Sequence, residues 1–161
     1  MAASFEDKDK GWAAFFKHAA ELADAGKAKV GVLGNAAAQP HHDSKLTVGE
    51  IAVINEFGTE DGHVPERSFL RSTFDESRAD LASEARAFTL RVLDGRMKAR
   101  QAVALLAQSL VAKVRRKITS GEGVPPPNAP STIAAKGSSR PLVDTGQLVH
   151  AITYQIGDKE K

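Results

Sequence analysis

The sequence contains no cysteine, few aromatic residues and no long apolar segment. Without cysteine, the chain has neither a disulfide framework nor a thiolate metal site, and it offers no thiol nucleophile. Aromatic residues make up 6% of the chain, so we expect a core of alanine, leucine, valine and isoleucine. No apolar run approaches the ~20 residues that a membrane-spanning helix needs, and we expect no membrane contact. The polar start of the sequence has no signal-peptide apolar region, so we expect the protein to stay in the cell that makes it.

The chain also lacks an excess of either charge. It has 22 basic and 20 acidic residues and a formal net charge of +2, so no net field attracts phosphate. This balance argues against nucleic-acid binding by the chain as a whole. A length of 161 residues suits one domain, and such a domain buries roughly 70% of its unfolded surface. We therefore expect a single domain over residues 1–161.

Apolar periodicity predicts about four helices. They span residues 9–25, 48–57, 73–93 and 98–118. Thr47 and Glu50 have the spacing of a capping box at the start of the second helix, and Gly58 follows its end. The dipeptide Asp94-Gly95 separates the last two helices, which predicts an antiparallel pair or one kinked long helix.

Two β-like segments lie far apart in the chain. Residues 29–33 form a short β-like run, and residues 145–156 contain a plausible terminal strand. If they pair, they form a small, mostly antiparallel sheet backed by helices. Polar loops that each contain a proline cover 35–45 and 58–68. The predicted fold class is therefore α+β, with about four helices packed on a small sheet and with long loops.

A proline-rich segment follows the last predicted helix. Residues 120–130 combine glycine with four prolines, a composition that cannot continue a helix and favours extended polyproline geometry. The unstructured stretch 120–141 is too long for an ordinary connection inside a compact domain. We expect an extended arm over 120–147 that is loose in the monomer and ordered by a neighbour. The alternative is a disordered linker.

One motif suggests an aspartic protease. Asp144-Thr145-Gly146 matches the signature in which two aspartates share a proton, and a homodimer would supply the second copy. That fold needs several strands after the motif, whereas only 17 residues follow Asp144 here. The predicted helices are also wrong for an all-β protease. We favour a turn in which Gly146 takes a permissive backbone angle.

A second motif suggests a metal site. His41, His42 and Asp43 carry transition-metal ligands, and His63 in the next loop is a third imidazole candidate. Adjacent side chains of an extended segment point to opposite sides, so both histidines cannot easily reach one ion. We favour exposed loop histidines. No convincing nucleophile–base pair is visible, and we expect no catalytic residue, metal or cofactor.

Four basic residues lie at the end of the last predicted helix, and they are the candidate DNA-facing residues. They are Lys113, Arg115, Arg116 and Lys117. Phosphate contact is one interpretation. We favour the other, in which cations at a helix C-terminus complement the helix dipole. No aromatic residues lie between them to stack on bases.

Three segments in order carry a resemblance to a known family. They are residues 50–59 (EIAVINEFGT), 64–71 (VPERSFLR) and 129–148 (APSTIAAKGSSRPLVDTGQL), closing on 151–154 (AITY). The ordered set resembles phage neck and tail-completion proteins, which include the minor tail protein Z type of lambda-like phages and the virion morphogenesis proteins of Mu-like phages. The resemblance covers roughly residues 28–157. Where the family often has Arg-Asn-Ser after Gly-Gln-Leu, this chain has Val149-His150-Ala151.

The resemblance implies a structural virion protein and not an enzyme. Such a subunit is made in the host cytoplasm and joins a homo-oligomeric ring at the head–tail junction. The ring bridges the head connector and the tail terminator or tail tube, and phage DNA passes through its lumen without being read. The alternatives are the tail terminator itself, or a small DNA-binding protein that uses residues 113–117.

The segments themselves suggest which residues form contacts. Loop 58–68 is held at both ends by apolar anchors, and Arg67 or Arg71 can find a carboxylate on a neighbouring subunit. The alternative is an intrachain loop with solvated charges. Prolines lower the entropy lost when an arm becomes ordered, which favours the arm as an interface. The candidate interface or loop-positioning residues are Phe57, Pro65, Arg67, Phe69, Arg71, Pro130, Lys136, Arg140, Asp144 and Gln147.

Overall fold

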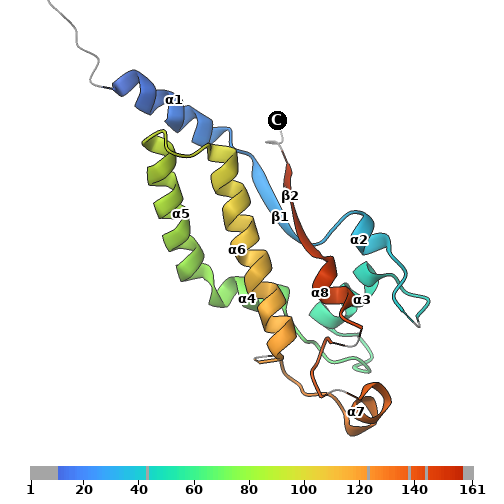
Figure 1. Cartoon of the computed structure of the whole chain (residues 1–161). Coiled ribbons are helices and arrows are strands. Elements are labelled where there is room, and N and C mark those ends of the chain that lie inside the picture. Colours follow the sequence, from blue (N-terminus) through green and yellow to red (C-terminus); the bar gives the residue numbers. More distant parts are fainter. Residues whose placement is uncertain (1–10, 43, 123, 138, 144, 158–161) are drawn as a thin grey trace, which may run out of the picture.

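The computed structural model describes residues 11–42, 44–122, 124–137, 139–143 and 145–157. Within these residues the fold combines eight helices with one small antiparallel sheet (Figure 1), which confirms the mixed α and β class. In chain order the elements are α1 (Trp12–Ala23), β1 (Lys27–Val32), α2 (Asn35–Ala38), α3 (Val48–Phe57), α4 (Leu70–Glu76), α5 (Arg78–Leu93), α6 (Ala99–Ser120), α7 (Pro130–Lys136), α8 (Gln147–Ala151) and β2 (Ile152–Gly157).

The sheet consists of β1 and β2, which pair as predicted from residues at opposite ends of the chain. Lys27 lies opposite Gly157, and Val32 lies opposite Ile152. Helix α6 packs on the sheet, and the Gln108 side-chain amide donates to the Tyr154 hydroxyl at 2.9 Å. The long helix therefore fixes the position of a sheet that is too small to be stable alone.

Two apolar clusters form the core. The larger joins α6, the sheet, α3, α4 and α8, and its buried members are Ala52, Phe69, Val111, Val114, Ile118, Leu148 and Ile152. The smaller joins the end of α5 to the start of α6 beside α1, and its buried members are Ala25, Val92, Ala99 and Ala102. Phenylalanine contributes one fully buried side chain, and aliphatic residues fill most of the remainder, as the composition predicts.

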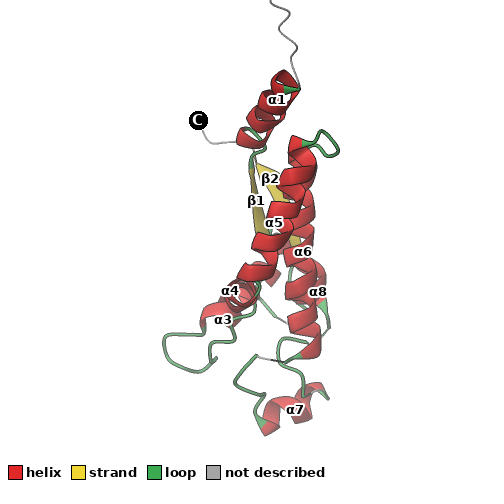
Figure 2. Cartoon of the chain, turned by 90° about the vertical axis from the view of Figure 1, so that its left-hand side faces the viewer, coloured by secondary structure: helices red, strands yellow, loops and turns green. Residues whose placement is uncertain are grey.

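Helices α5 and α6 form the predicted antiparallel pair (Figures 1 and 2). The turn between them contains Gly95 at φ 71°, where a Cβ atom would lie 2.7 Å from the His18 ring. A side chain there would force the His18 ring to shift, and the positive φ also favours glycine. Nδ1 of His18 lies 3.1 Å from the Leu93 carbonyl oxygen, which attaches α1 to the end of α5.

Three boundaries differ from the prediction. The helix expected over 73–93 is divided at Ser77, a buried residue with φ −92° and ψ 1° that separates α4 from α5. The arm expected over 120–147 is not extended throughout, because residues 130–136 form α7, with Pro130 in its first turn. Helix α8 occupies 147–151, so the terminal strand begins later than expected.

Helix α1 forms where predicted, but its apolar stripe is not buried. Trp12 is 62% exposed and Phe16 is 64% exposed, and no residue of α1 is buried. Trp12, Phe15 and Phe16 instead pack against one another, with ring centroids about 6 Å apart. No helix in the described part of the chain is long and apolar enough to cross a membrane.

Candidate assembly interface

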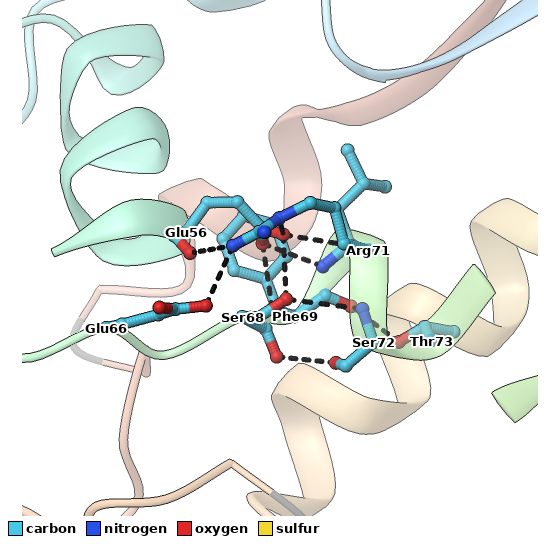
Figure 3. A network of polar contacts seen from close by, with 8 residues as sticks. Glu56, Glu66, Ser68, Phe69, Arg71, Ser72 and Thr73 are labelled. Atoms are coloured by element: carbon cyan, nitrogen blue, oxygen red, sulfur yellow. Dashed lines mark hydrogen bonds and ion pairs between the residues drawn. The ribbon is translucent and has the colours of Figure 1, made fainter. Parts of the chain in front are cut away.

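A buried carboxylate organises the junction between α3 and α4. Glu56 is 5% exposed and accepts hydrogen bonds from the backbone amides of Phe69, Leu70 and Arg71 at 2.8–3.0 Å (Figure 3). The Ser68 hydroxyl donates at 2.8 Å and Nε of Arg71 at 3.0 Å. The first amides of a helix have no partner within it, so Glu56 caps α4 from a neighbouring helix.

The hydrogen bonds decide the ionisation of Glu56. Burial alone would raise its pKa, because a charge is less stable away from water. The backbone amides of Leu70 and Arg71, with Ser68 and Phe69, outweigh burial and hold the pKa of Glu56 below the usual carboxyl value. Its oxygens are already occupied by donors, so the carboxylate is placed to hold the chain and not to accept a substrate proton.

Arg71 joins this junction to the end of the loop that connects α3 to α4. Its guanidinium forms ion pairs with Glu56 at 3.0 Å and with Glu66 at 2.8 Å, and it donates to the Glu56 carbonyl oxygen at 3.1 Å. It also lies over the Phe57 ring, 4.5 Å from the centroid, although that ring is 58% exposed. The carboxylates that Arg71 finds are therefore in its own chain.

Loop 58–68 is held by its own hydrogen bonds. Gly58 has φ 74°, and a Cβ there would lie 2.8 Å from the Glu66 amide nitrogen, because the loop returns directly against it. The Thr59 amide donates to the Val64 carbonyl oxygen at 2.9 Å. The Asp61 carboxylate accepts from the Thr59 hydroxyl at 2.6 Å, which is the main cause of its lowered pKa. The loop is thus a preformed surface.

Arg67 connects this loop to the proline-rich segment. Its Nε donates to the Pro126 carbonyl oxygen at 3.0 Å, and Nη2 lies 3.5 Å from the Pro127 carbonyl oxygen. The Arg67 amide donates to the Asn55 carbonyl oxygen at 2.7 Å, which fixes the base of the side chain on α3. Burial lowers the pKa of Arg67, and no carboxylate among the described residues pairs with it.

The proline-rich segment is attached to the body at several points. Val124 is 4% exposed and Asn128 is 8% exposed, and the Asn128 amide donates to the Arg140 carbonyl oxygen at 3.1 Å. Pro141 is also buried. The expectation of an arm that is loose in the monomer is therefore not confirmed. The segment carries helix α7 at the end of the molecule opposite α1 (Figure 1).

Gln147 attaches a third loop at the start of α8. Its side-chain oxygen accepts from the His42 amide at 2.8 Å, and its side-chain nitrogen lies 3.5 Å from the Pro40 carbonyl oxygen. The loop of residues 40–47 is thereby brought next to a helix that follows it by more than one hundred residues. We call residues 40–47, 58–68 and 124–130, with the first turn of α8, the loop platform.

A cleft of about 190 Å³ opens between the parts of the loop platform. Its described polar lining comprises His41, Asn55, Arg67, Asn128, Thr132, Thr145 and Gln147. Nδ1 of His41 is sealed from solvent and has no hydrogen-bond partner among the described residues. The lining is rich in donors, and Arg67 is the only arginine or lysine among its described residues. This arrangement is suited to a carboxylate presented from outside the chain.

The remaining candidate interface residues have different positions. Phe69 is 2% exposed and belongs to the core, where it anchors loop 58–68 and cannot touch a neighbour. Pro65 is partly buried within that loop, whereas Pro130 and Arg140 are exposed. Asp144 lies outside the described residues, as does the side chain of Lys136.

The basic end of α6 is mostly engaged within the fold. Lys113 pairs with Asp80 at 3.0 Å, and the buried Lys117 pairs with Glu76 at 2.6 Å. Arg115 donates to the Ile152 carbonyl oxygen at 2.7 Å. Of the four candidate DNA-facing residues, Arg116 is the one that is exposed and has no partner in the described part of the chain. Three of the four cations therefore have partners within the chain.

Two motifs in the sequence suggested chemistry: the aspartic-protease signature at 144–146 and the histidines at 41 and 42. Neither forms a reactive site among the described residues. No cluster of three histidine, cysteine, aspartate or glutamate residues there could hold a metal ion, although Asp43 lies outside them. Gly146 has φ 80°, which agrees with the predicted turn. Asp144 itself is not described.

Sequence reasoning did not identify Glu56 or Asn128. A carboxylate in the last turn of α3 is unfavourable with respect to the helix dipole, and that anomaly is the signal that could have identified Glu56. Asn128 lies among prolines, where an amide side chain is a natural hydrogen-bond donor to a nearby loop. We find no match to the chain among protein-family models, curated proteins or solved structures.

Proposed function

We propose that the chain is a structural subunit of the head–tail junction of a long-tailed bacteriophage, where it forms a ring with copies of itself. The observation that carries this proposal is the loop platform. Arg67 joins loop 58–68 to the proline-rich segment, and Gln147 joins the loop of residues 40–47 to α8. Residues of these segments line a donor-rich cleft. A preformed loop surface loses little entropy when it meets a partner.

The resemblance of residues 50–59, 64–71 and 129–148 to phage neck and tail-completion proteins supports the same role. These segments supply α3 with its following turn, the end of loop 58–68 with the start of α4, and α7 with the start of α8. They include Asn55, Arg67 and Gln147, whose hydrogen bonds connect the parts of the platform. In this proposal, residues 120–147 extend the platform toward a neighbouring subunit.

Arg67 is the proposed ion-pairing residue of the ring contact. It is partly desolvated, and it has only carbonyl partners among the described residues. A carboxylate on the adjacent subunit neutralises it in the cleft. Because the two partners are different surfaces of one chain, the contact is heterologous, and repeated contacts of this kind form a ring when the rotation between subunits closes. The engaged state of Lys113, Arg115 and Lys117 supports this role over DNA binding.

Particles made without this chain test the proposal. We expect electron microscopy to show full heads and finished tails that remain separate. The variant Arg67→Glu should fail to restore joined particles, because it places a carboxylate opposite the neighbour's carboxylate. Arg116→Glu is the matched control, since it reverses an exposed cation outside the cleft, and it should restore joining. Normal particles without the chain, or its location elsewhere in the virion, would refute the proposal.

A further inference from the structure

The outer edge of β1 has no partner strand among the residues that the structure describes. The sheet has two strands in the described part of the chain, so β1 pairs with β2 on one side only. In an antiparallel strand, alternate residues direct both their amide and their carbonyl toward the outer edge. These groups have no partner in the described residues, and an edge of this kind is a template for another strand.

An apolar groove of about 390 Å³ lies beside this edge. Ala28 and Val30 form its wall on the β1 side. Helix α6 contributes Leu106 and Leu110 to its lining, and helix α5 contributes Leu81. In Figure 2 the two strands lie behind α5 and α6. A strand added to β1 would therefore lie on α6 as the existing strands do.

The groove continues along the strand. A second hollow of about 260 Å³ is lined by residues 30–32 of β1 and the following Leu33, together with Phe57 and Leu70. A third hollow, lined by Val30, Leu70 and Phe74, shares lining residues with each of the other two. Together the three hollows lie along residues 28–33. This course matches an extended peptide, whose neighbouring strand lies about 4.8 Å away.

The charges of β1 indicate what such a peptide contains. Ala28 and Val30 face the groove, so Lys27 and Lys29 belong to the opposite face of the strand. Both lysines are exposed and have no partner in the described part of the chain. Opposite charges on adjacent strands attract one another. An added strand fits best when apolar side chains toward the groove alternate with acidic side chains beside the lysines.

We propose that the outer edge of β1 binds an extended segment of another protein, in which apolar and acidic residues alternate, as a third strand of the sheet. The strands of a second copy do not supply this pattern. Residues 152–157 contain no acidic residue, and residues 27–32 are basic. The proposal does not depend on the role at the head–tail junction, since it rests on a different face of the molecule.

The experiment uses the full chain and a fluorescent peptide of alternating valine and glutamate, about eight residues long as in a typical strand. One control peptide has the same composition with its valines in one block, and another has lysine in place of glutamate. Fluorescence anisotropy measures binding. We expect binding of the alternating acidic peptide only. Hydrogen exchange should slow at the amides of residues 28–32 when it binds.

Two sets of variants locate the site. Ala82 is exposed on α5 and lines the groove, so Ala82→Trp fills it. We expect binding to weaken at least about tenfold. Ala79→Trp, an equally exposed change on α5 outside the groove, should bind as the unchanged protein does. The double variant Lys27→Glu, Lys29→Glu should weaken binding of the acidic peptide about fivefold and permit binding of the lysine peptide.

Three results would overturn the proposal. They are no binding of the alternating acidic peptide, equal binding to the Ala82→Trp variant, and binding that leaves hydrogen exchange in β1 unchanged. The lysine variants change only exposed side chains, so they test the site even if Ala82→Trp impairs folding.

Discussion

The α3–α4 junction and the outer edge of β1 share the hollow lined by Glu56 and Val30, yet they differ in how fully their polar groups are satisfied. At the junction, every oxygen of the Glu56 side chain accepts hydrogen bonds, and Phe69 beneath it is 2% exposed. At the edge of β1, backbone groups have no partner in the described residues and the adjacent apolar groove is open.

The comparison separates groups that stabilise the fold from groups that are available to a partner. A buried glutamate in a network of donors attracts attention as a reactive group, but its bonds are all used within the chain. Strand β1 carries no reactive side chain, yet the amides and carbonyls of its outer edge are available to a partner. In a protein proposed to act by assembly, unsatisfied groups mark the contact surfaces better than unusual residues do.

The largest expected effect is at the saturated junction. Glu56→Ala removes the acceptor of three backbone amides, the Ser68 hydroxyl and the Arg71 guanidinium. The amides and the Ser68 hydroxyl then lose a partly buried acceptor, whereas Arg71 keeps its ion pair with Glu66. We expect the free energy of unfolding to fall by about 3–5 kcal/mol, measured by urea denaturation.

Glu66→Ala is the control for this prediction. It removes the exposed partner of the same arginine, whose ion pair is solvent-screened, and we expect a loss of less than about 1 kcal/mol. If Glu56→Ala and Glu66→Ala lowered the free energy of unfolding equally, the buried carboxylate would not hold the junction. The junction would then no longer differ from the edge of β1 in the way described above.

A second effect comes from the turn that follows α3. Gly58→Ala places a Cβ 2.8 Å from the Glu66 backbone nitrogen at a residue with φ 74°. Both the contact and the backbone angle oppose a side chain, and we expect a loss of about 2 kcal/mol in urea unfolding. Gly62→Ala tests the angle alone, because φ there is 70° and no atom lies within 4 Å of the added Cβ. An equal loss in both variants would show that loop 58–68 does not pack tightly against Gly58.

Residue patterns within a few positions of one another predicted the features that depend on near neighbours in sequence, such as helix caps and helix bounds. Thr47 and Glu50 form the capping box, with the Thr47 amide donating to Glu50 at 2.7 Å, and α3 has the predicted bounds. The separation of α4 from α5 at Ser77 was missed, because neither glycine nor proline marks it. Exposure of Trp12 and Phe16 was missed as well, since an apolar stripe predicts burial but not the presence of a surface to pack against.

The candidate site was predicted only in outline. Arg67 and Gln147 were identified as contact residues, and the structure shows which segments they connect. The sequence could not show that Arg71 pairs with Glu56, because that contact depends on how α3 and α4 pack. Nor could it show the groove beside β1, whose walls come from helices far away in the chain. Sequence spacing identifies residues that share one face of a helix or strand. A site between elements depends on how those elements pack, which spacing does not show.

A smaller effect concerns acid stability at the same junction. The pKa of Glu56 is lowered in the folded chain, so the unfolded chain binds the proton more tightly. The stabilisation is complete above the ordinary glutamate pKa of about 4.3 and is lost as the pH falls toward the folded value. We therefore expect the stability difference between the unchanged protein and Glu56→Gln to narrow as the pH falls below about 4.5. Urea unfolding of the unchanged protein and of Glu56→Gln, measured from neutral to acidic pH, gives this difference. A difference in unfolding free energy that stays constant with pH would contradict the prediction.

The smallest expected effect is at the exposed aromatic residues of α1. Phe16→Ser alters a side chain that is 64% exposed and stacks on Trp12 with a centroid distance of 6.0 Å. Little apolar surface is buried there, so we expect urea unfolding to change by less than about 0.5 kcal/mol. The same substitution at Phe69, which is 2% exposed, should cost about 4 kcal/mol because it empties a core position. If the free energy of unfolding fell nearly as much for Phe16→Ser as for Phe69→Ser, the aromatic face of α1 would be covered in solution. Helix α1 would then resemble the α3–α4 junction, whose groups are satisfied, and not the open edge of β1.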